Sequence, residues 1–337
     1  MQRDRNRQII IGAVTSVVMI MIAVCGSAST APSSYASTAA TSNTSEAQAW
    51  AEVRAATSEA QVLAAVRDAQ KLQTLPNNVE PGLTVTTDAA GIPDPAGKCP
   101  NISGLMEQGC VYGDLKSKKL MVVYGDSHAA MWAEALRIIA NRAGWRLDVF
   151  FLSGCQLPDL PLISSQTNQL NTQCQQFHAL AARAIRKLHP NLLVLSSESS
   201  GQTAVGVPAT PAQWQSGLMK TFASVSEPGT STVMIGDIPQ WSLNDADCLA
   251  AHMTSVQSCA VAPAQALSSN LQAEERAATL RGAKYIQTTA WACAAKCEPV
   301  INNIRVYFNQ YHFGAIYIYY LSGALQQALG IPTATNG

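Results

Sequence analysis

Apolar and polar positions alternate with two different periods after residue 119, and these periods predict strands and helices in turn. Five short runs rich in Val, Ile, Leu and Phe are bounded by polar or turn residues, as buried strands are. The predicted strands span residues 120–126, 147–153, 191–196, 232–238 and 284–289. Helical spacing of apolar residues predicts helices at about 129–143, 170–188, 211–225, 263–282 and 313–329. Buried strands that alternate with helices indicate an α/β fold, whose parallel sheet is covered on both faces.

Five such strands favour a flavodoxin-like fold, a three-layer α/β/α sandwich around a five-stranded parallel sheet. In an open parallel sheet, ligands bind at the carboxyl ends of the strands. Polar side chains that directly follow a predicted strand are therefore the first candidates for a functional site.

The chain before residue 119 has a different pattern. Three arginines precede a 17-residue apolar run at 9–25, and a small polar stretch follows it, which is typical of an export signal or a short membrane anchor. Residues beyond this segment are therefore expected outside the cytoplasm, secreted or membrane-anchored. The predicted organisation is a signal or anchor at 1–30, a flexible Ala/Ser/Thr-rich linker at 31–45, a helical and irregular extension at 46–118 (its helix at 46–72), and the main domain at 119–332.

Charge composition excludes one class of partner. The 337 residues include 22 Lys and Arg against 22 Asp and Glu, so the formal net charge is zero. No run or stripe of basic residues is present, and nucleic-acid binding depends on such a positive surface. We therefore expect no nucleic-acid partner.

The number of cysteines also indicates an exported protein. Apart from Cys25 in the apolar run there are eight, and an even number in an exported chain indicates a disulfide framework. Short loops cost the least entropy to close, so cysteines that are neighbours along the chain are expected to pair. The predicted disulfides are Cys99–Cys110, Cys155–Cys174, Cys248–Cys259 and Cys293–Cys297. A zinc site is the alternative, but no second Cys/His couple has the spacing of a zinc finger, so we expect no metal and no cofactor.

The most reactive junction of the chain is Gly125-Asp126-Ser127-His128, between the first predicted strand and its helix. A serine there lies at the carboxyl edge of the sheet and near a helix N-terminus, where N–H groups can stabilise an oxyanion. The alternative is ordinary helix capping, since Asp and Ser are both common N-cap residues.

A serine nucleophile needs a base, and the chain has five histidines. His312 follows the fifth predicted strand and precedes the last helix, so it shares a sheet edge with Ser127. Its strand lies about three strand spacings away, ~14 Å at ~4.8 Å each, so the loop at 290–311 must bridge the gap. The side chain of His128 should diverge from its neighbour Ser127, and His178, inside a predicted helix, is interpreted as structural.

These residues resemble the SGNH (GDSL-type) ester hydrolases and acyltransferases, and more narrowly the extracytoplasmic SGNH domain associated with acyltransferase-3 membrane proteins. The resemblance runs from about Cys99 to Leu329. It rests on Gly-Asp-Ser-His-Ala at 125–129, Gly154-Cys155 after the second strand, the ordered cysteine couples and the Tyr…His block at 307–312.

The resemblance implies a role for each matching residue. Ser127 would be the nucleophile and His312 the base, and the amides of Ser127 and Gly154 would bind the oxyanion. The family has Asp three residues before the histidine, whereas this chain has Asn309, which cannot stabilise an imidazolium by charge. The family's third-block Asn is also absent. The segment at 195–203 offers Ser197, Glu198 and Ser199 there, so side-chain oxyanion donation is unassigned. The residues that could support the site are Asp126, His128, Asp237 and Glu198.

The resemblance therefore implies an extracytoplasmic serine esterase or O-acyltransferase. It would act on acyl esters of envelope glycans or glycolipids through an acyl-serine, with a membrane acyl-donor protein as a partner. The alternative that Asn309 favours is a catalytically degenerate carbohydrate-binding or scaffold domain. A metallophosphoesterase is disfavoured because its Asn-His-Asp/Glu box is missing, and an α/β-hydrolase because Gly-x-Ser-x-Gly is missing.

Overall fold

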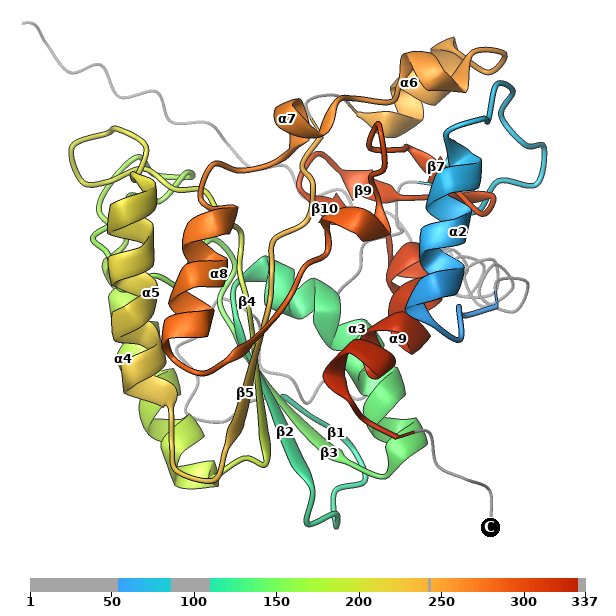
Figure 1. Ribbon diagram of the computed structural model, residues 1–337. Helices are drawn as coiled ribbons and strands as arrows, with labels where there is room; N and C mark the ends of the chain where they lie inside the picture. The colour runs from blue at the N-terminus through green and yellow to red at the C-terminus, as the bar shows by residue number, and fades with distance from the viewer. Residues whose placement is uncertain (1–53, 86–109, 242–243, 333–337) are drawn as a thin grey trace, which may run out of the picture. The chain divides into compact units, whose positions relative to one another are not determined.

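A computed structural model describes residues 54–85, 110–241 and 244–332. Its centre is a six-stranded sheet with the order β1-β3-β2-β4-β5-β6 (Figure 1). The five predicted strands are all present and parallel, which confirms the flavodoxin-like arrangement. Their bounds are Leu120–Gly125 (β2), Arg146–Phe151 (β3), Leu192–Ser196 (β4), Ser231–Ile235 (β5) and Lys284–Ile286 (β6).

One edge strand was not predicted. β1 (Cys110–Gly113) pairs antiparallel with β3 and places Cys110 opposite Val149. It is only four residues long and partly exposed, so its sequence has no clear alternation of apolar and polar positions. The sheet therefore extends into the segment that the sequence assigned to the irregular extension.

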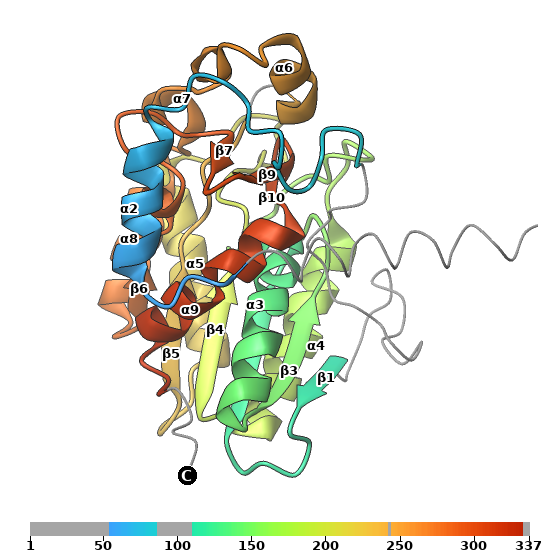
Figure 2. The same ribbon diagram turned by 90° about the vertical axis from the view of Figure 1, so that its right-hand side faces the viewer.

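Helices cover both faces of the sheet, as predicted. On one face, α3 (Ser127–Ala143) packs against α9 (Ala315–Leu329). On the other lie α4 (Thr172–Leu188), α5 (Pro211–Val225) and α8 (Leu271–Leu280), and Figures 1 and 2 show the two groups on opposite sides of the strands. Alternate residues of β2 enter the two cores, since Val123 belongs to the first cluster and Val122 to the second.

The predicted helix at 263–282 is two helices, α7 (Pro263–Ala266) and α8. Between them, Ser268 Oγ and Asn270 Nδ2 both donate to the carbonyl of Ser199, at 2.8 and 2.9 Å. Ser and Asn side chains compete with helical hydrogen bonding, and here a tertiary acceptor holds them. The break therefore has a cause that lies after β4, far away in sequence.

The extension contributes α2 (Glu59–Ala69), which is shorter than the predicted helix at 46–72. Ser58 caps it by accepting from the amide of Gln61, so the helix begins there. Val62 and Val66 are buried, and α2 packs against α9. Residues 46–53 of the prediction lie outside the described residues.

The long segment after β6 contains short elements that periodicity could not predict. They are η3 (Thr289–Trp291), β7 (Val300–Ile301), β8 (Ile304–Arg305), β9 (Tyr307–Asn309) and β10 (His312–Phe313). β7 and β8 form a hairpin whose turn residues, Asn302 and Asn303, have φ of 52° and 59°. Asn tolerates positive φ in such hairpin turns, so the Asn-Asn pair was the missed signal. The excursion between β5 and α7 similarly holds α6 (Asp245–Ala251) and η2 (Val256–Ser258).

Three of the four predicted disulfides are present: Cys155–Cys174, Cys248–Cys259 and Cys293–Cys297. The fourth prediction includes Cys99, which lies outside the described residues, as do the predicted signal or anchor at 1–30 and linker at 31–45. Among the described helices, none is both long and apolar enough to cross a membrane.

Candidate active site

Ser127 is the first residue of α3, and only Asp126 separates it from the end of β2. The strand end must be glycine, because a Cβ on Gly125 would lie 1.8 Å from the carbonyl oxygen of Ser196 in β4. The helix is capped by Asp126, whose Oδ1 accepts from the amide of His128 at 2.8 Å. Asp126 therefore caps the helix, and the Ser127 hydroxyl remains available to another hydrogen-bond partner.

That partner is His312, which lies in β10 at the same edge of the sheet. Its Nε2 lies 2.9 Å from Ser127 Oγ, and its Nδ1 lies 3.0 Å from Oδ1 of Asn309. Ser127, His312 and Asn309 are each partly exposed, so a substrate can reach them. The segment from β6 to β10 thus closes the gap of three strand spacings that the sequence predicted.

The hydrogen bonds of Asn309 assign the histidine tautomer. Oδ1 of Asn309 also accepts from the amides of Tyr311 and His312, at 2.9 and 3.0 Å, so the amide oxygen must face this group of donors. Nδ1 of His312 therefore carries a proton and donates to Asn309. Nε2 keeps its lone pair and accepts from the Ser127 hydroxyl, which is the arrangement that a general base requires.

The environment disfavours the charged form of His312. Burial, and then the nearby His128, lower its pKa to about 4, and the Asp237 carboxylate opposes them. His312 is therefore neutral over the whole range from weakly acidic to alkaline pH.

The backbone amides of Ser127 and Gly154 are the candidates to bind an oxyanion. Gly154 follows β3 with φ of 70°, a conformation that favours glycine. Its carbonyl accepts from Asn171 Nδ2 at 3.1 Å, which fixes the peptide that follows it. Within the described chain, the amides of Ser127 and Gly154 donate to no other residue. Both are the donors that the resemblance implies.

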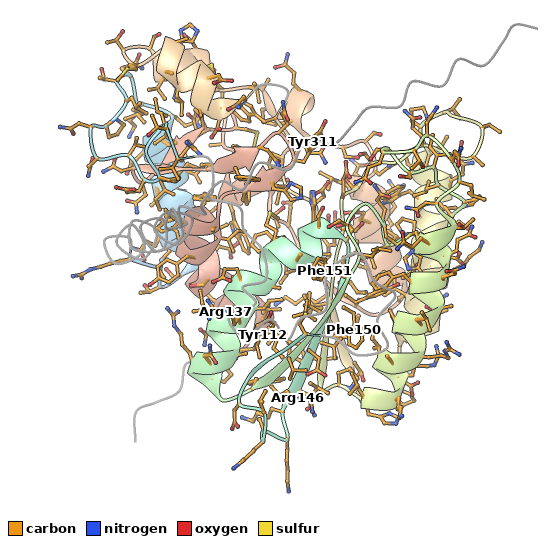
Figure 3. The ribbon with its side chains drawn as sticks, turned by 180° about the vertical axis from the view of Figure 1, so that it is seen from behind. Tyr112, Arg137, Arg146, Phe150, Phe151 and Tyr311 are labelled. Atoms are coloured by element: carbon orange, nitrogen blue, oxygen red, sulfur yellow. A yellow bond between two sulfur atoms is a disulfide. The ribbon has the colours of Figure 1, made fainter. Side chains whose placement is uncertain are left out.

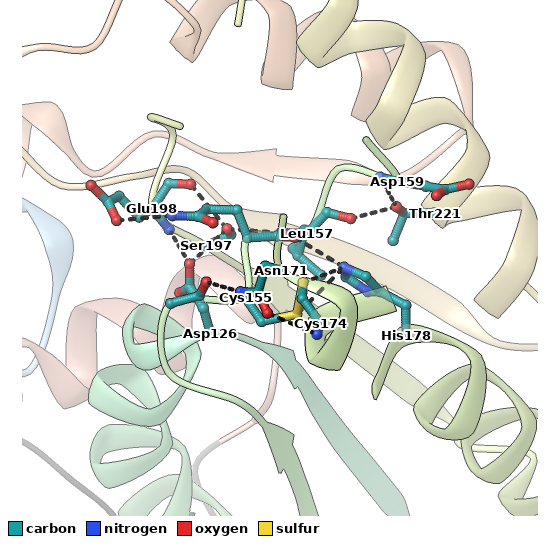
Figure 4. The surroundings of a disulfide bond; sticks show 12 residues. Asp126, Cys155, Leu157, Asp159, Asn171, Cys174, His178, Ser197, Glu198 and Thr221 are labelled. Atoms are coloured by element: carbon teal, nitrogen blue, oxygen red, sulfur yellow. Dashed lines mark hydrogen bonds between the residues drawn. A yellow bond between two sulfur atoms is a disulfide. The ribbon is translucent and has the colours of Figure 1, made fainter. Parts of the chain in front are cut away.

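The loop after β4 supports the junction from the side (Figure 4). Oδ2 of Asp126 accepts from Ser197 Oγ at 2.9 Å and from the amide of Glu198 at 3.0 Å. The carboxylate of Glu198 accepts from Ser200 and Gln156 and makes no contact with His312. Glu198 therefore does not replace the family's Asp, and Asp126 links the ends of β2 and β4.

Asp237 does not contact His312 either, but it contacts His128. Oδ1 of Asp237 lies 2.6 Å from Nδ1 of His128, and both side chains are 1% exposed. The His128 ring in turn lies 5.0 Å, between centroids, from the ring of His312. The two supporting residues thus form a buried pair behind the base, a pairing that sequence reasoning did not predict.

His178 lies among structural groups, as interpreted from its position in a helix. It contacts the Tyr124 hydroxyl, both sulfurs of the Cys155–Cys174 disulfide and the Gln156 carbonyl (Figure 4). Cys155, Cys174 and His178 form the one cluster with metal-ligand spacing in the described chain. Its sulfurs are bonded to each other, and only thiolates ligate metals strongly, so the cluster does not fit a metal ion.

Tyr311 is an exposed residue that directly precedes His312 in the sequence. It follows Asn309 in the β9–β10 connection, and its side chain is 50% exposed. Figure 3 shows it at the end of the sheet opposite to Arg146, where β3 begins.

Comparison with known proteins identifies the family. The model of the family described as "SGNH domain (fused to AT3 domains)" matches residues 96–327, which is more than half of the chain. The fold and the match define an SGNH domain of the hydrolase and acyltransferase type. The chain belongs to the family of such domains that are linked to AT3 acyltransferases.

Solved structures that the chain resembles share little sequence with it. The periplasmic domain of a lipopolysaccharide acetyltransferase from Salmonella ser. Paratyphi A is 14% identical, with 64% of this chain and 84% of that chain covered and a TM-score of 0.49. A GDSL-like lipase from Bacteroides thetaiotaomicron is 11% identical, with 63% and 88% covered and a TM-score of 0.41. No curated protein matches the chain.

Proposed function

We propose that this domain is an extracytoplasmic serine esterase or O-acyltransferase that acts on acyl esters of cell-envelope glycans or glycolipids. The observation that supports it best is the 2.9 Å contact between Ser127 Oγ and a His312 Nε2 that is free to accept a proton. The fusion of family members to AT3 domains supports the acyl chemistry and an acyl-donor membrane protein as partner.

The reaction has two halves. Ser127 Oγ attacks the ester carbonyl carbon as its proton passes to Nε2 of His312, and the amides of Ser127 and Gly154 bind the oxyanion. The intermediate collapses, the C–O bond to the alcohol breaks, and His312 returns the proton to that alcohol. An acyl-serine remains. Water or an acceptor hydroxyl then attacks it, gives its proton to His312, and Ser127 recovers its proton as it leaves.

Asn309 also supports a second candidate function. It orients His312 but adds no negative charge, so the imidazolium formed in each half-reaction gains less stabilisation than in relatives with Asp. A domain that has lost turnover and binds envelope carbohydrate is the alternative that this residue favours.

The test combines turnover with labelling of the nucleophile. Wild type and Ser127→Ala are compared on a short-chain aryl ester, and Ser127 is probed with an active-site-directed phosphonate followed by peptide mass analysis. We expect turnover and labelling in the wild type and neither in Ser127→Ala, because only the serine supplies the attacking oxygen.

Ser226→Ala is the matched control, since Ser226 is an exposed serine that follows α5 at the opposite edge of the sheet. It should retain full turnover. Activity that survives in Ser127→Ala would overturn the nucleophile assignment. A folded wild type without turnover or labelling would favour the binding domain.

A further inference from the structure

His128 and Asp237 form a buried ion pair that the proposed reaction does not use directly. The two side chains meet at 2.6 Å behind the site, and each is 1% exposed. Neither nitrogen of the His128 ring makes a well-aligned hydrogen bond to another described residue. The attraction between opposite charges, rather than hydrogen-bond geometry, therefore dominates this contact.

Hydrogen bonds from the surroundings hold the Asp237 carboxylate in place. Oδ2 accepts from the amide and the hydroxyl of Ser199, both at 2.8 Å, and from Gln240 Nε2 at 3.3 Å. Oδ1 accepts from the amide of Ile238 at 2.8 Å. These four hydrogen bonds fix the carboxylate of Asp237 in its position next to His128.

Other charged groups around His128 are also acidic. Asp126 precedes it by two residues, Glu198 faces it from the loop after β4, and Glu274 lies beyond Asp237 on α8. Burial lowers the pKa of His128, but the carboxylates of Asp237, Asp126 and Glu198 outweigh burial and raise it to about 9. Burial raises the pKa of Glu274 well above its ordinary value, and the nearby Asp237 raises it further.

The one basic group that faces this pair among the described residues is His312. Its ring lies 5.0 Å from the His128 ring, and both rings are largely shielded from solvent. A charge on one ring therefore opposes a charge on the other with little screening.

We propose that His128, held by Asp237, is a positioning residue that carries a fixed positive charge beside His312 and keeps the base unprotonated in acidic surroundings. The inference rests on the proposed function, because it assigns His312 as the base. Asn309 acts in the same direction, since it adds no negative charge that would favour imidazolium. We therefore expect the activity to persist at acidic pH. The same effect makes His312 a weaker base, because its protonated form is less stable.

Histidine NMR tests the coupling without any need for turnover. In the wild type we expect the His312 ring to titrate near pH 4 and the His128 ring to be protonated at pH 7. In His128→Gln the midpoint of His312 should rise by about 1 to 2 pH units, because the like charge is gone. A neutral His128 at pH 7 in the wild type overturns the proposal, even if the variant does not fold.

The pH profile of kcat/KM on the aryl ester tests whether the charge on His128 affects catalysis. The acidic limb of His128→Gln should move upward by the same amount as the NMR midpoint, a shift that mere loss of packing would not cause. His252→Gln, which replaces an exposed histidine after α6, should leave the limb unchanged. An unmoved limb or midpoint in folded His128→Gln overturns this inference alone, whereas a wild type without turnover overturns the proposed function.

Discussion

At the scale of single residues, Asn309 separates two tasks that an Asp at this position performs together. Its amide oxygen accepts from Nδ1 of His312 at 3.0 Å and so fixes the ring and its tautomer. It cannot add the negative charge that stabilises imidazolium. The sequence raised the question of whether the site keeps a competent base, and the geometry shows that orientation is retained while charge is not.

Asn309→Asp should raise the plateau of kcat about 5-fold to 30-fold. A hydrogen bond to a charged group is worth about 1 to 2 kcal/mol more than a neutral one, and about 1.4 kcal/mol corresponds to tenfold in rate. The carboxylate also raises the pKa of His312, so the acidic limb of the pH profile should shift upward. The measurement is the pH dependence of aryl-ester turnover.

Asn309→Ala is the matched control and should lower kcat, because the ring loses its acceptor. An Asn309→Asp variant that folds, still requires Ser127 and gains nothing would show that charge at this position does not limit the reaction. Burial of His312 and the charge on His128 would then determine its basicity.

At the scale of elements, the segment between β6 and α9 determines whether His312 reaches Ser127. The ring of Trp291 in η3 packs against Trp132 of α3, and the Cys293–Cys297 disulfide follows at once. The amide and carbonyl of Cys297 then pair with Val261, at 2.8 and 3.2 Å. These contacts anchor a segment whose strands are too short to be stable alone.

Removal of Cys293–Cys297 should therefore lower activity as well as stability. The disulfide closes a separation of 4 residues, for which loop closure predicts about 2 kcal/mol. Looser anchoring of the segment that carries His312 should lower kcat about 10-fold or more. The double variant Cys293→Ala/Cys297→Ala is measured by urea unfolding and by turnover at 25 °C.

The Cys248–Cys259 disulfide provides the comparison, because it lies in the excursion that holds α6. Its separation of 11 residues predicts a larger stability loss, about 3 kcal/mol, with turnover of the folded protein unchanged. Equal loss of turnover in both double variants would show that the Cys293–Cys297 segment has no special role in placing His312.

At the scale of the whole molecule, the sequence predicted what strong periodicity encodes. The five parallel strands are apolar runs that alternate with helices of clear periodicity, and the carboxyl edge of the sheet followed from their order. β1, the hairpins around Asn302 and the break before α8 were not predictable, because each depends on two to four residues or on a tertiary acceptor such as Ser199. The His128–Asp237 contact likewise forms only when β2 and β5 share a sheet.

The same His128–Asp237 pair should make the folded protein less stable as the pH rises into the alkaline range. The pKa of His128 is raised in the folded state, to about 9 against an ordinary value near 6.5, so the folded protein holds a proton that the unfolded chain has lost. This stabilisation is fully present below pH 6.5 and is lost as the pH rises through about 9. The difference corresponds to about 3 kcal/mol in the free energy of unfolding. Glu298, whose pKa burial raises to about 7, adds a smaller loss at the start of this range.

Urea unfolding at pH 6.5, 8 and 9 measures this slope. The free energy of unfolding of the wild type should fall across the series. His128→Gln should be less stable than wild type at pH 6.5, because Asp237 is left buried without its cation, but its free energy should change much less between pH 6.5 and 9. Tyrosines with raised pKa lie outside this window, since their ordinary value is near 10, and His252→Gln should keep the wild-type slope because that side chain is exposed. Parallel curves for wild type and His128→Gln would mean that His128 is neutral in the folded protein at neutral pH, and the charge beside His312 would then have to come from elsewhere.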